Sequence, residues 1–155
     1  MKNYTITIDT GTTNTRVFLF NEKNEVAASA KSEIGVRITA IDGNNNRLKT
    51  AIRCCLEEVL KQAGITYDEV KKVVASGMIT SNVGLVEIPH VIAPASAEDL
   101  AEAAKSVLIE DVCPLPILFI PGVKNRDGKL DLATFESMDM MRGEEVETVA
   151  VVESL

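Results

Sequence analysis

A short polar segment at the end of the first apolar run constrains this chain more than any other feature of its sequence. Residues 8–16 read Ile-Asp-Thr-Gly-Thr-Thr-Asn-Thr-Arg. Gly11 lets the backbone approach an anion closely, and the turn offers further side-chain donors from Thr12, Thr13 and Asn14. Asp9 would repel a phosphate unless a cation stood between them, so the segment predicts a Mg²⁺-nucleotide site in which Asp9 holds the ion through water. The alternative is an ordinary polar hairpin turn.

Two other kinds of phosphate-binding loop are missing from the sequence. Neither G-x-x-x-x-G-K-[ST] nor G-x-G-x-x-G occurs anywhere in the 155 residues. P-loop and dinucleotide-binding readings are therefore disfavoured.

Composition narrows the class of protein further. A length of 155 residues with 46% hydrophobic content suits one compact domain with a sizeable core. A net charge of −7 without a cluster of lysine and arginine argues against nucleic acid or an anionic membrane as the main partner. No run approaches the roughly 20 apolar residues of a membrane span, and no secretory h-region follows Met1, so we expect a cytoplasmic protein. The three cysteines show no C-x-x-C spacing and are expected to be reduced and buried.

Hydrophobic periodicity predicts an antiparallel β-meander followed by a helix. The three strands are expected over Tyr4–Ile8, Val17–Phe20 and Val26–Ser32. Apolar residues then recur at helical spacing from Leu48 to Ala63, and Gly64 ends that helix. Two further strands are expected over Lys72–Ala75 and Val86–Ile92, the second with Pro89 at an edge or bulge. A capped helix is then expected from Ser96 to about Leu108, followed by a strand over Pro116–Ile120. The chain is expected to end with a loop over Pro121–Gly128 and a helix from about Gly143.

This order of elements, with a phosphate turn between the first two strands, resembles one of the two domains of the actin, Hsp70 and sugar-kinase superfamily. Within it the chain is similar to the 2-dehydro-3-deoxygalactonokinase family through four stretches, residues 8–16, 35–37, 75–78 with 84–89, and 141–145. The resemblance implies an α/β, ribonuclease H-like (actin-like ATPase) fold, a βββαβ-type mixed sheet flanked by helices. It also implies that residues 1–155 are the N-terminal domain and that the family's C-terminal domain is absent from this chain.

The resemblance implies an enzyme of D-galactonate catabolism that uses ATP and Mg²⁺ to phosphorylate the 6-hydroxyl of 2-dehydro-3-deoxy-D-galactonate. Its catalytic carboxylates would be Glu144 as general base, with Asp139 as the alternative base, and Asp9, which also holds the metal. Nucleotide contacts are expected from Asp9, Gly11, Thr12, Thr13, Asn14 and Arg16. Contacts to the sugar acid are expected from Arg37, Ser76, Gly77, Met78, Ser81 and Arg142, since arginine binds carboxylates bidentately and a loop after a buried strand offers hydroxyl and backbone donors.

Each of these residues also has a structural explanation. A carboxylate at a helix start, such as Glu144 or Glu145, is favoured by the helix dipole alone, and Ser76-Gly77 after a strand is often only a turn. Glu87 is expected on the solvent face of an edge strand. His90, the single histidine, is expected to line a pocket wall or the surface rather than to catalyse.

Three functional hypotheses follow from the sequence. The first is the kinase half described above, which alone should show little or no activity because one domain does not enclose ATP. The second is a non-catalytic phosphate- or sugar-binding module, or an inactive fragment of the same superfamily. The third is a phosphatase or regulatory ATPase with the same turn. An exposed apolar hinge face would invite homo-oligomer formation.

Overall fold

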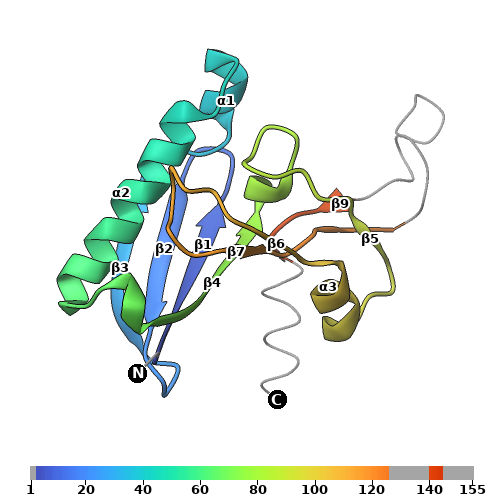
Figure 1. The fold of residues 1–155 in the computed structure, drawn as a ribbon. Helices are drawn as coiled ribbons and strands as arrows, with labels where there is room; N and C mark the ends of the chain where they lie inside the picture. Colours follow the sequence, from blue (N-terminus) through green and yellow to red (C-terminus); the bar gives the residue numbers. More distant parts are fainter. Residues whose placement is uncertain (1–2, 126–139, 145–155) are drawn as a thin grey trace.

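The first three strands form the meander that the sequence predicts. The structure, a computed structural model, describes residues 3–125 and 140–144. In it β1 (Tyr4–Thr10), β2 (Thr15–Phe20) and β3 (Val26–Ser32) pair antiparallel in chain order. Ile6 and Ile8 are fully buried and alternate with half-buried residues, so they lie on the face of β1 that points into the core. The meander forms one half of a six-stranded sheet (Figure 1).

The other half of the large sheet is assembled from later parts of the chain. Strand β4 (Val70–Gly77) lies parallel to β1, β7 (Ile117–Phe119) lies parallel to β4, and β6 (Lys105–Val107) closes the edge antiparallel to β7. The strand order is therefore β3-β2-β1-β4-β7-β6. Because β1 and β4 run in the same direction, both end at the same edge of the sheet, and this edge carries the candidate site.

Helix α2 (Asn46–Ala63) packs on β2 and β3 and forms the core with the large sheet (Figure 1). Its buried side chains include Leu48, Ile52, Leu56 and Val59, and Gly64 ends it in the left-handed conformation, as the sequence predicts. A short helix that the sequence does not signal, α1 (Arg37–Asp42), precedes it. Nothing in the described part of the chain forms a helix long and apolar enough to cross a membrane.

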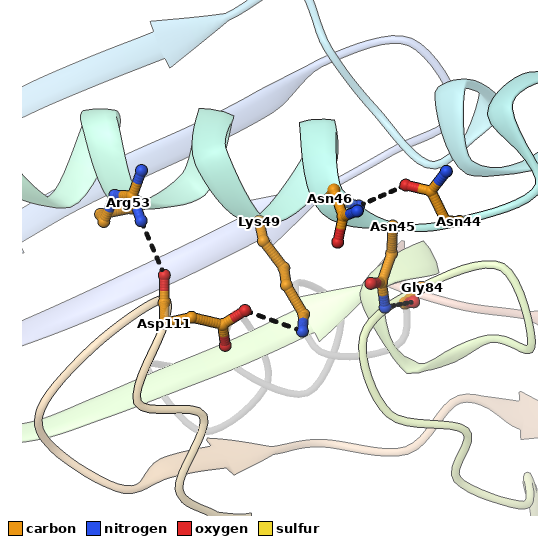
Figure 2. A network of polar contacts seen from close by, with 7 residues as sticks. All are labelled: Asn44, Asn45, Asn46, Lys49, Arg53, Gly84 and Asp111. Carbon is orange, nitrogen blue, oxygen red and sulfur yellow. Dashed lines mark hydrogen bonds and ion pairs between the residues drawn. The ribbon is translucent and has the colours of Figure 1, made fainter.

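Polar contacts fix α2 to two loops (Figure 2). Lys49 pairs with the Asp111 carboxylate at 3.0 Å, and Arg53 donates to the Asp111 carbonyl at 3.1 Å. At the start of the helix, the Asn45 side chain donates to the Gly84 carbonyl at 3.5 Å. The loop that contains Gly84 is thereby held against the helix, and this loop contributes to the candidate site.

The described residues also form a second, three-stranded sheet. It consists of β5 (Val91–Ile92), β8 (Val123–Lys124) and β9 (Met140–Met141), with β5 parallel and β9 antiparallel to β8. Short 3₁₀ turns, η1 (Tyr67–Glu69) and η2 (Met78–Thr80), precede and follow β4. Helix α3 (Ala97–Ala103) begins with the predicted capping box, in which Ser96 and Asp99 exchange hydrogen bonds.

Several predicted elements differ from the observed ones. Only Val91–Ile92 of the predicted strand Val86–Ile92 is a strand, because the N–H groups of Leu85, Val86 and Ile88 instead donate back to the Ile79 and Thr80 carbonyls. Glu87 is exposed but lies in this loop.

The predicted helix to about Leu108 is wrong beyond Ala103. Residues 105–107 form β6 against β7, and the β-branched Val107 suits a strand better than a helix. The predicted loop Pro121–Gly128 contains β8. The final helix, expected from about Gly143, lies almost wholly outside the described residues.

The expectation that all cysteines are buried is also wrong for one of them. Cys55 and Cys113 are buried, whereas Cys54 is exposed, because neighbouring side chains on a helix point in different directions. All three are free thiols, as expected. Burial raises the thiol pKa of Cys55 and of Cys113.

Candidate functional site

The predicted phosphate turn is the tight connection between β1 and β2. The Gly11 N–H donates to the Asn14 carbonyl at 2.9 Å, and the Asn14 side chain donates to Thr13 Oγ1 at 2.9 Å. Thr12 and Thr13 are exposed, and their N–H groups have no acceptor within residues 3–125 and 140–144. The tip of the turn therefore presents backbone and hydroxyl donors to solvent, which is the donor set that a phosphate requires.

Residues 35–37 hold this turn in place through backbone hydrogen bonds. The Val36 N–H donates to the Gly11 carbonyl at 3.1 Å, and the Arg37 N–H donates to the Thr12 carbonyl at 3.0 Å. A Cβ at position 35 would collide with these same two carbonyl groups, so only glycine permits the approach. The Arg37 side chain is exposed and lines a hollow of about 300 Å³ beside Thr12. Its main chain orders the turn, and its side chain lies near the expected phosphate rather than near the residues expected to contact the sugar.

Asp9 and Arg16 face each other across the base of the turn. They are register partners on β1 and β2, and their side chains form an ion pair at 3.8 Å. Both side chains are about half exposed, at 42% and 54% respectively. An exposed carboxylate beside an exposed guanidinium can contact both the metal and the phosphate of a bound nucleotide.

Two glycines join this turn to the last described segment. Gly77 adopts φ +88°, and a Cβ there would lie 2.7 Å from the Thr10 carbonyl and 3.1 Å from Asp9 Oδ1. Gly143 adopts φ +116°, and a Cβ there would lie 3.4 Å from Gly77 Cα. Glu144, which is exposed and follows Gly143, is thus brought to the end of β1 and β4. Asp139, the alternative base, and Glu145 lie outside the described residues.

A pocket of about 640 Å³ lies on the other side of this glycine contact. It is lined by Ser81, Asn82, Glu87, Ile88, Pro89, His90, Lys105, Lys124 and Arg142. Ser81 donates its hydroxyl to the Met78 carbonyl at 2.7 Å, so its oxygen can still accept a hydrogen bond. A hollow of similar size, about 660 Å³, lies between β3 and α2 and is lined by none of the expected site residues.

Arg142 organises one wall of the pocket. Its Nη1 donates to the Thr80 carbonyl at 2.8 Å and to Thr80 Oγ1 at 2.7 Å. Its Nη2 donates to the Ile88 carbonyl at 3.0 Å and contacts His90 Nδ1 at 3.3 Å. Thr80 in turn donates its hydroxyl to the Gly77 carbonyl at 3.0 Å. Arg142 therefore connects the pocket wall to the glycine contact.

The protonation state of His90 follows from this arrangement. Burial, and then the positive charges of Arg142 and Lys124, lower the pKa of His90 to about 4. Arginine has no acceptor, so Nδ1 must accept from Arg142 and the ring proton resides on Nε2. At neutral pH His90 is an uncharged pocket-lining donor, which agrees with the expectation that it lines a pocket wall.

The structure thus separates the expected site residues into two groups. Asp9, the residues of the turn and Arg16 lie at the strand ends with Gly77 and Glu144, whereas Ser81 and Arg142 line the pocket. Ser76 pairs with Asp9 across β1 and β4, and Met78 is half-buried at the start of η2. Sequence reasoning missed three pocket residues, Asn82, Lys105 and Lys124. Single lysines in short strands carry no motif, so no signal in the sequence indicated them.

Within the described residues, no group of three or more histidine, cysteine, aspartate or glutamate side chains could hold a metal. A magnesium ion bound with a nucleotide takes most of its ligands from phosphate and water, so a single exposed carboxylate such as Asp9 suits it.

Three comparisons bear on this geometry. Residues 9–155 match the model of a family described as 2-keto-3-deoxy-galactonokinase. A candidate 2-dehydro-3-deoxygalactonokinase from Sinorhizobium meliloti, solved as a crystal structure, superposes with a TM-score of 0.69 and 25% identity over 97% of this chain and 43% of that chain. A glycerol kinase from Oceanobacillus iheyensis is 30% identical over 71 residues, which are 44% of this chain and 14% of that protein. The chain therefore spans less than half the length of either relative, and the superposition confirms the expected fold.

Proposed function

Because the chain belongs to the 2-keto-3-deoxy-galactonokinase family, we propose that it forms the N-terminal half of an ATP-dependent sugar-acid kinase. The reaction would transfer the γ-phosphoryl group of ATP to the 6-hydroxyl of 2-dehydro-3-deoxy-D-galactonate. The observation that carries the proposal is the contact of Gly77 with both Asp9 and Gly143. This contact supports the proposal, because it brings a donor-rich turn and an exposed carboxylate close together.

Bound Mg²⁺-ATP supplies the phosphoryl group and the cation that neutralises its charge. Asp9 would hold the metal, and the N–H and hydroxyl groups of Thr12 and Thr13 would hold phosphate oxygens. Gly11, Asn14 and Arg16 complete this contact set. In phosphoryl transfer the protein mainly positions the reactants and compensates charge, and this rigid, donor-rich turn suits that role.

Glu144 would accept the proton of the 6-hydroxyl as the oxygen attacks the γ-phosphorus and the bond from that phosphorus to the ADP oxygen breaks. Its support is its exposure and its position directly after Gly143. Asp139 remains the alternative base. Ser76, Gly77, Met78 and Ser81 would contact the sugar chain at the adjoining loop, and Arg37 supports the turn.

We propose that a second domain of the whole protein would supply the adenosine pocket, so we expect the 155-residue chain to show little or no activity by itself. A cytoplasmic location follows from the use of ATP as co-substrate. Homo-oligomer formation through an exposed hinge face remains a prediction, and a clean monomer at high concentration in sizing chromatography would contradict it.

The test is an ADP-release assay with Mg²⁺-ATP and 2-dehydro-3-deoxy-D-galactonate. It is run on this chain and on a longer chain encoded by extending the reading frame. We expect activity only in the longer chain, with kcat reduced at least about 100-fold by Asp9→Asn and by Glu144→Gln. Asp68→Asn and Glu102→Gln are matched controls, because both residues are exposed and lie away from the strand ends.

Each other outcome identifies an alternative. If Asp139→Asn abolishes turnover while Glu144→Gln does not, Asp139 is the base. Equal turnover of the gluconate-type epimer would remove the substrate preference. ADP release without any sugar acid would favour a phosphatase or ATPase, and binding without turnover in both chains would favour a binding module.

A further inference from the structure

The pocket beside the glycine contact has a charge opposite to that of the chain. Among residues 3–125 and 140–144, three cationic side chains line it, Lys105, Lys124 and Arg142, and one carboxylate, Glu87. The whole sequence carries a formal net charge of −7. A local excess of positive charge in an acidic chain attracts an anionic ligand and repels cationic ones.

The guanidinium of Arg142 already has hydrogen-bond partners within the chain. A guanidinium has five N–H donors, of which four belong to Nη1 and Nη2. Those four are directed at the Thr80 carbonyl and hydroxyl, the Ile88 carbonyl and His90 Nδ1. The expected bidentate contact from Arg142 to a substrate carboxylate would break this network, so Arg142 orders the wall and adds charge to it.

The two lysines reach the pocket from different sheets. Lys105 lies on β6 at the edge of the large sheet, and Lys124 lies on β8 in the middle of the small sheet. An ammonium group on a flexible four-carbon stem adapts to the position of its ligand, and two of them suit the two oxygens of a carboxylate. His90 adds a neutral Nε2–H donor to the same lining, which suits a carbonyl oxygen next to that carboxylate.

The expected base follows the wall of this pocket closely along the chain. Arg142 lines the pocket and Glu144 is two residues further on, so their Cα atoms lie at most about 7 Å apart. The pocket and the expected base are therefore near neighbours.

We propose that Lys105 and Lys124 bind the carboxylate of a 2-keto acid in this pocket and make the chain select acids over neutral sugars. As a statement about the acceptor substrate, this inference rests on the proposed kinase function. As a statement about binding, it can be tested separately.

The binding test uses calorimetric titration of this chain with three probes. These are 2-dehydro-3-deoxy-D-galactonate, pyruvate as the smallest 2-keto acid, and galactitol as a neutral six-carbon polyol. We expect Lys105→Gln and Lys124→Gln each to raise the Kd for both acids about tenfold, and the double variant to raise it further. The matched control is Lys72→Gln, because Lys72 is exposed and lines a different hollow near the start of β4; it should change the Kd less than twofold.

Unchanged acid binding in the double variant would overturn the inference. It would also be overturned if galactitol bound as tightly as the sugar acid, or if the wild-type chain bound no acid. The longer chain separates this result from the kinase proposal. There, the lysine variants should raise KM for the acid about tenfold while kcat and KM for ATP stay within twofold. Acid binding that depends on the lysines, in chains that never release ADP, would support the pocket and refute the kinase.

Discussion

Replacing Gly77 by alanine should lower the free energy of unfolding by about 3 kcal/mol. Gly77 has φ +88° and ψ −153°, a region essentially reserved for glycine, where another residue costs about 1 to 3 kcal/mol. The added Cβ would also lie 2.7 Å from the Thr10 carbonyl oxygen, a backbone atom that cannot rotate away. Displacing packed backbone costs about 1 kcal/mol or more, which brings the sum to about 3 kcal/mol.

Gly43→Ala is the matched control for this substitution. Gly43 also has a positive φ, +69°, at the end of α1, but a Cβ there would meet nothing within 4 Å. Only the left-handed conformation is penalised, so we expect a loss of about 1 kcal/mol. Urea denaturation followed by circular dichroism measures both values, and the difference between them reports the crowding at the glycine contact.

Equal losses in the two variants would refute this reasoning, because they would show that β1 and β4 relax at no cost. A second readout tests the functional part. The Gly77→Ala side chain would press on Asp9 Oδ1, so Mg²⁺-ATP binding at low temperature, where the variant stays folded, should weaken at least tenfold. Gly43→Ala should leave that binding unchanged.

Three further predictions concern single side chains. Arg142→Lys should destabilise the chain by about 2 kcal/mol, because an ammonium does not replace the planar guanidinium that donates to two carbonyls, a hydroxyl and His90. The control is Arg47→Lys at the exposed start of α2, which should have almost no effect in the same denaturation assay. His90 has a folded-state pKa of about 4, below its unfolded value of about 6.5, so its contribution to the free energy of unfolding is fully present above pH 6.5 and is lost as the pH falls towards 4. The loss should be about 1 kcal/mol after allowing for solvent screening. It should be missing in His90→Gln when unfolding is measured across that pH range. In a maleimide-labelling experiment Cys54 should react in the native state, while Cys55 and Cys113 should react only in denaturant; native labelling of all three would show that the core opens.

The parts of the fold that follow from the sequence are those with local causes. The meander and α2 were predictable because alternation and helical periodicity are read within one segment, and Gly64 marks the helix end directly. Strands β5, β6 and β8 span two or three residues each and exist only because distant partners pair with them. No window of sequence around Lys105 or Val123 contains that information.

In the candidate site, too, the parts formed by one contiguous segment were predictable and the parts that depend on distant strand pairing were not. The turn between β1 and β2 is contiguous, so its residue types and its place after a strand were sufficient to predict the turn, while phosphate binding there stays a prediction. The basic pocket depends on Lys105 reaching β7 and Lys124 reaching β5, which brings together side chains that are 19 positions apart in the printed numbering. The role of Arg142 as an organiser of the wall was equally invisible, since its partners Thr80 and Ile88 lie 62 and 54 residues away.

The parallel pairing of β1 with β4 also sets the order in which the site can mature during synthesis. The hairpin with the phosphate turn closes over a few residues and can form as soon as β2 has left the ribosome. Its parallel neighbour begins only at Val70, and the segment that brings Gly143 against Gly77 emerges nearly 70 residues after that glycine. A nascent chain therefore exposes a formed turn long before the candidate site is complete, and the proposed binding of nucleotide and acid together would become possible only in one late step, when residues 140–144 dock.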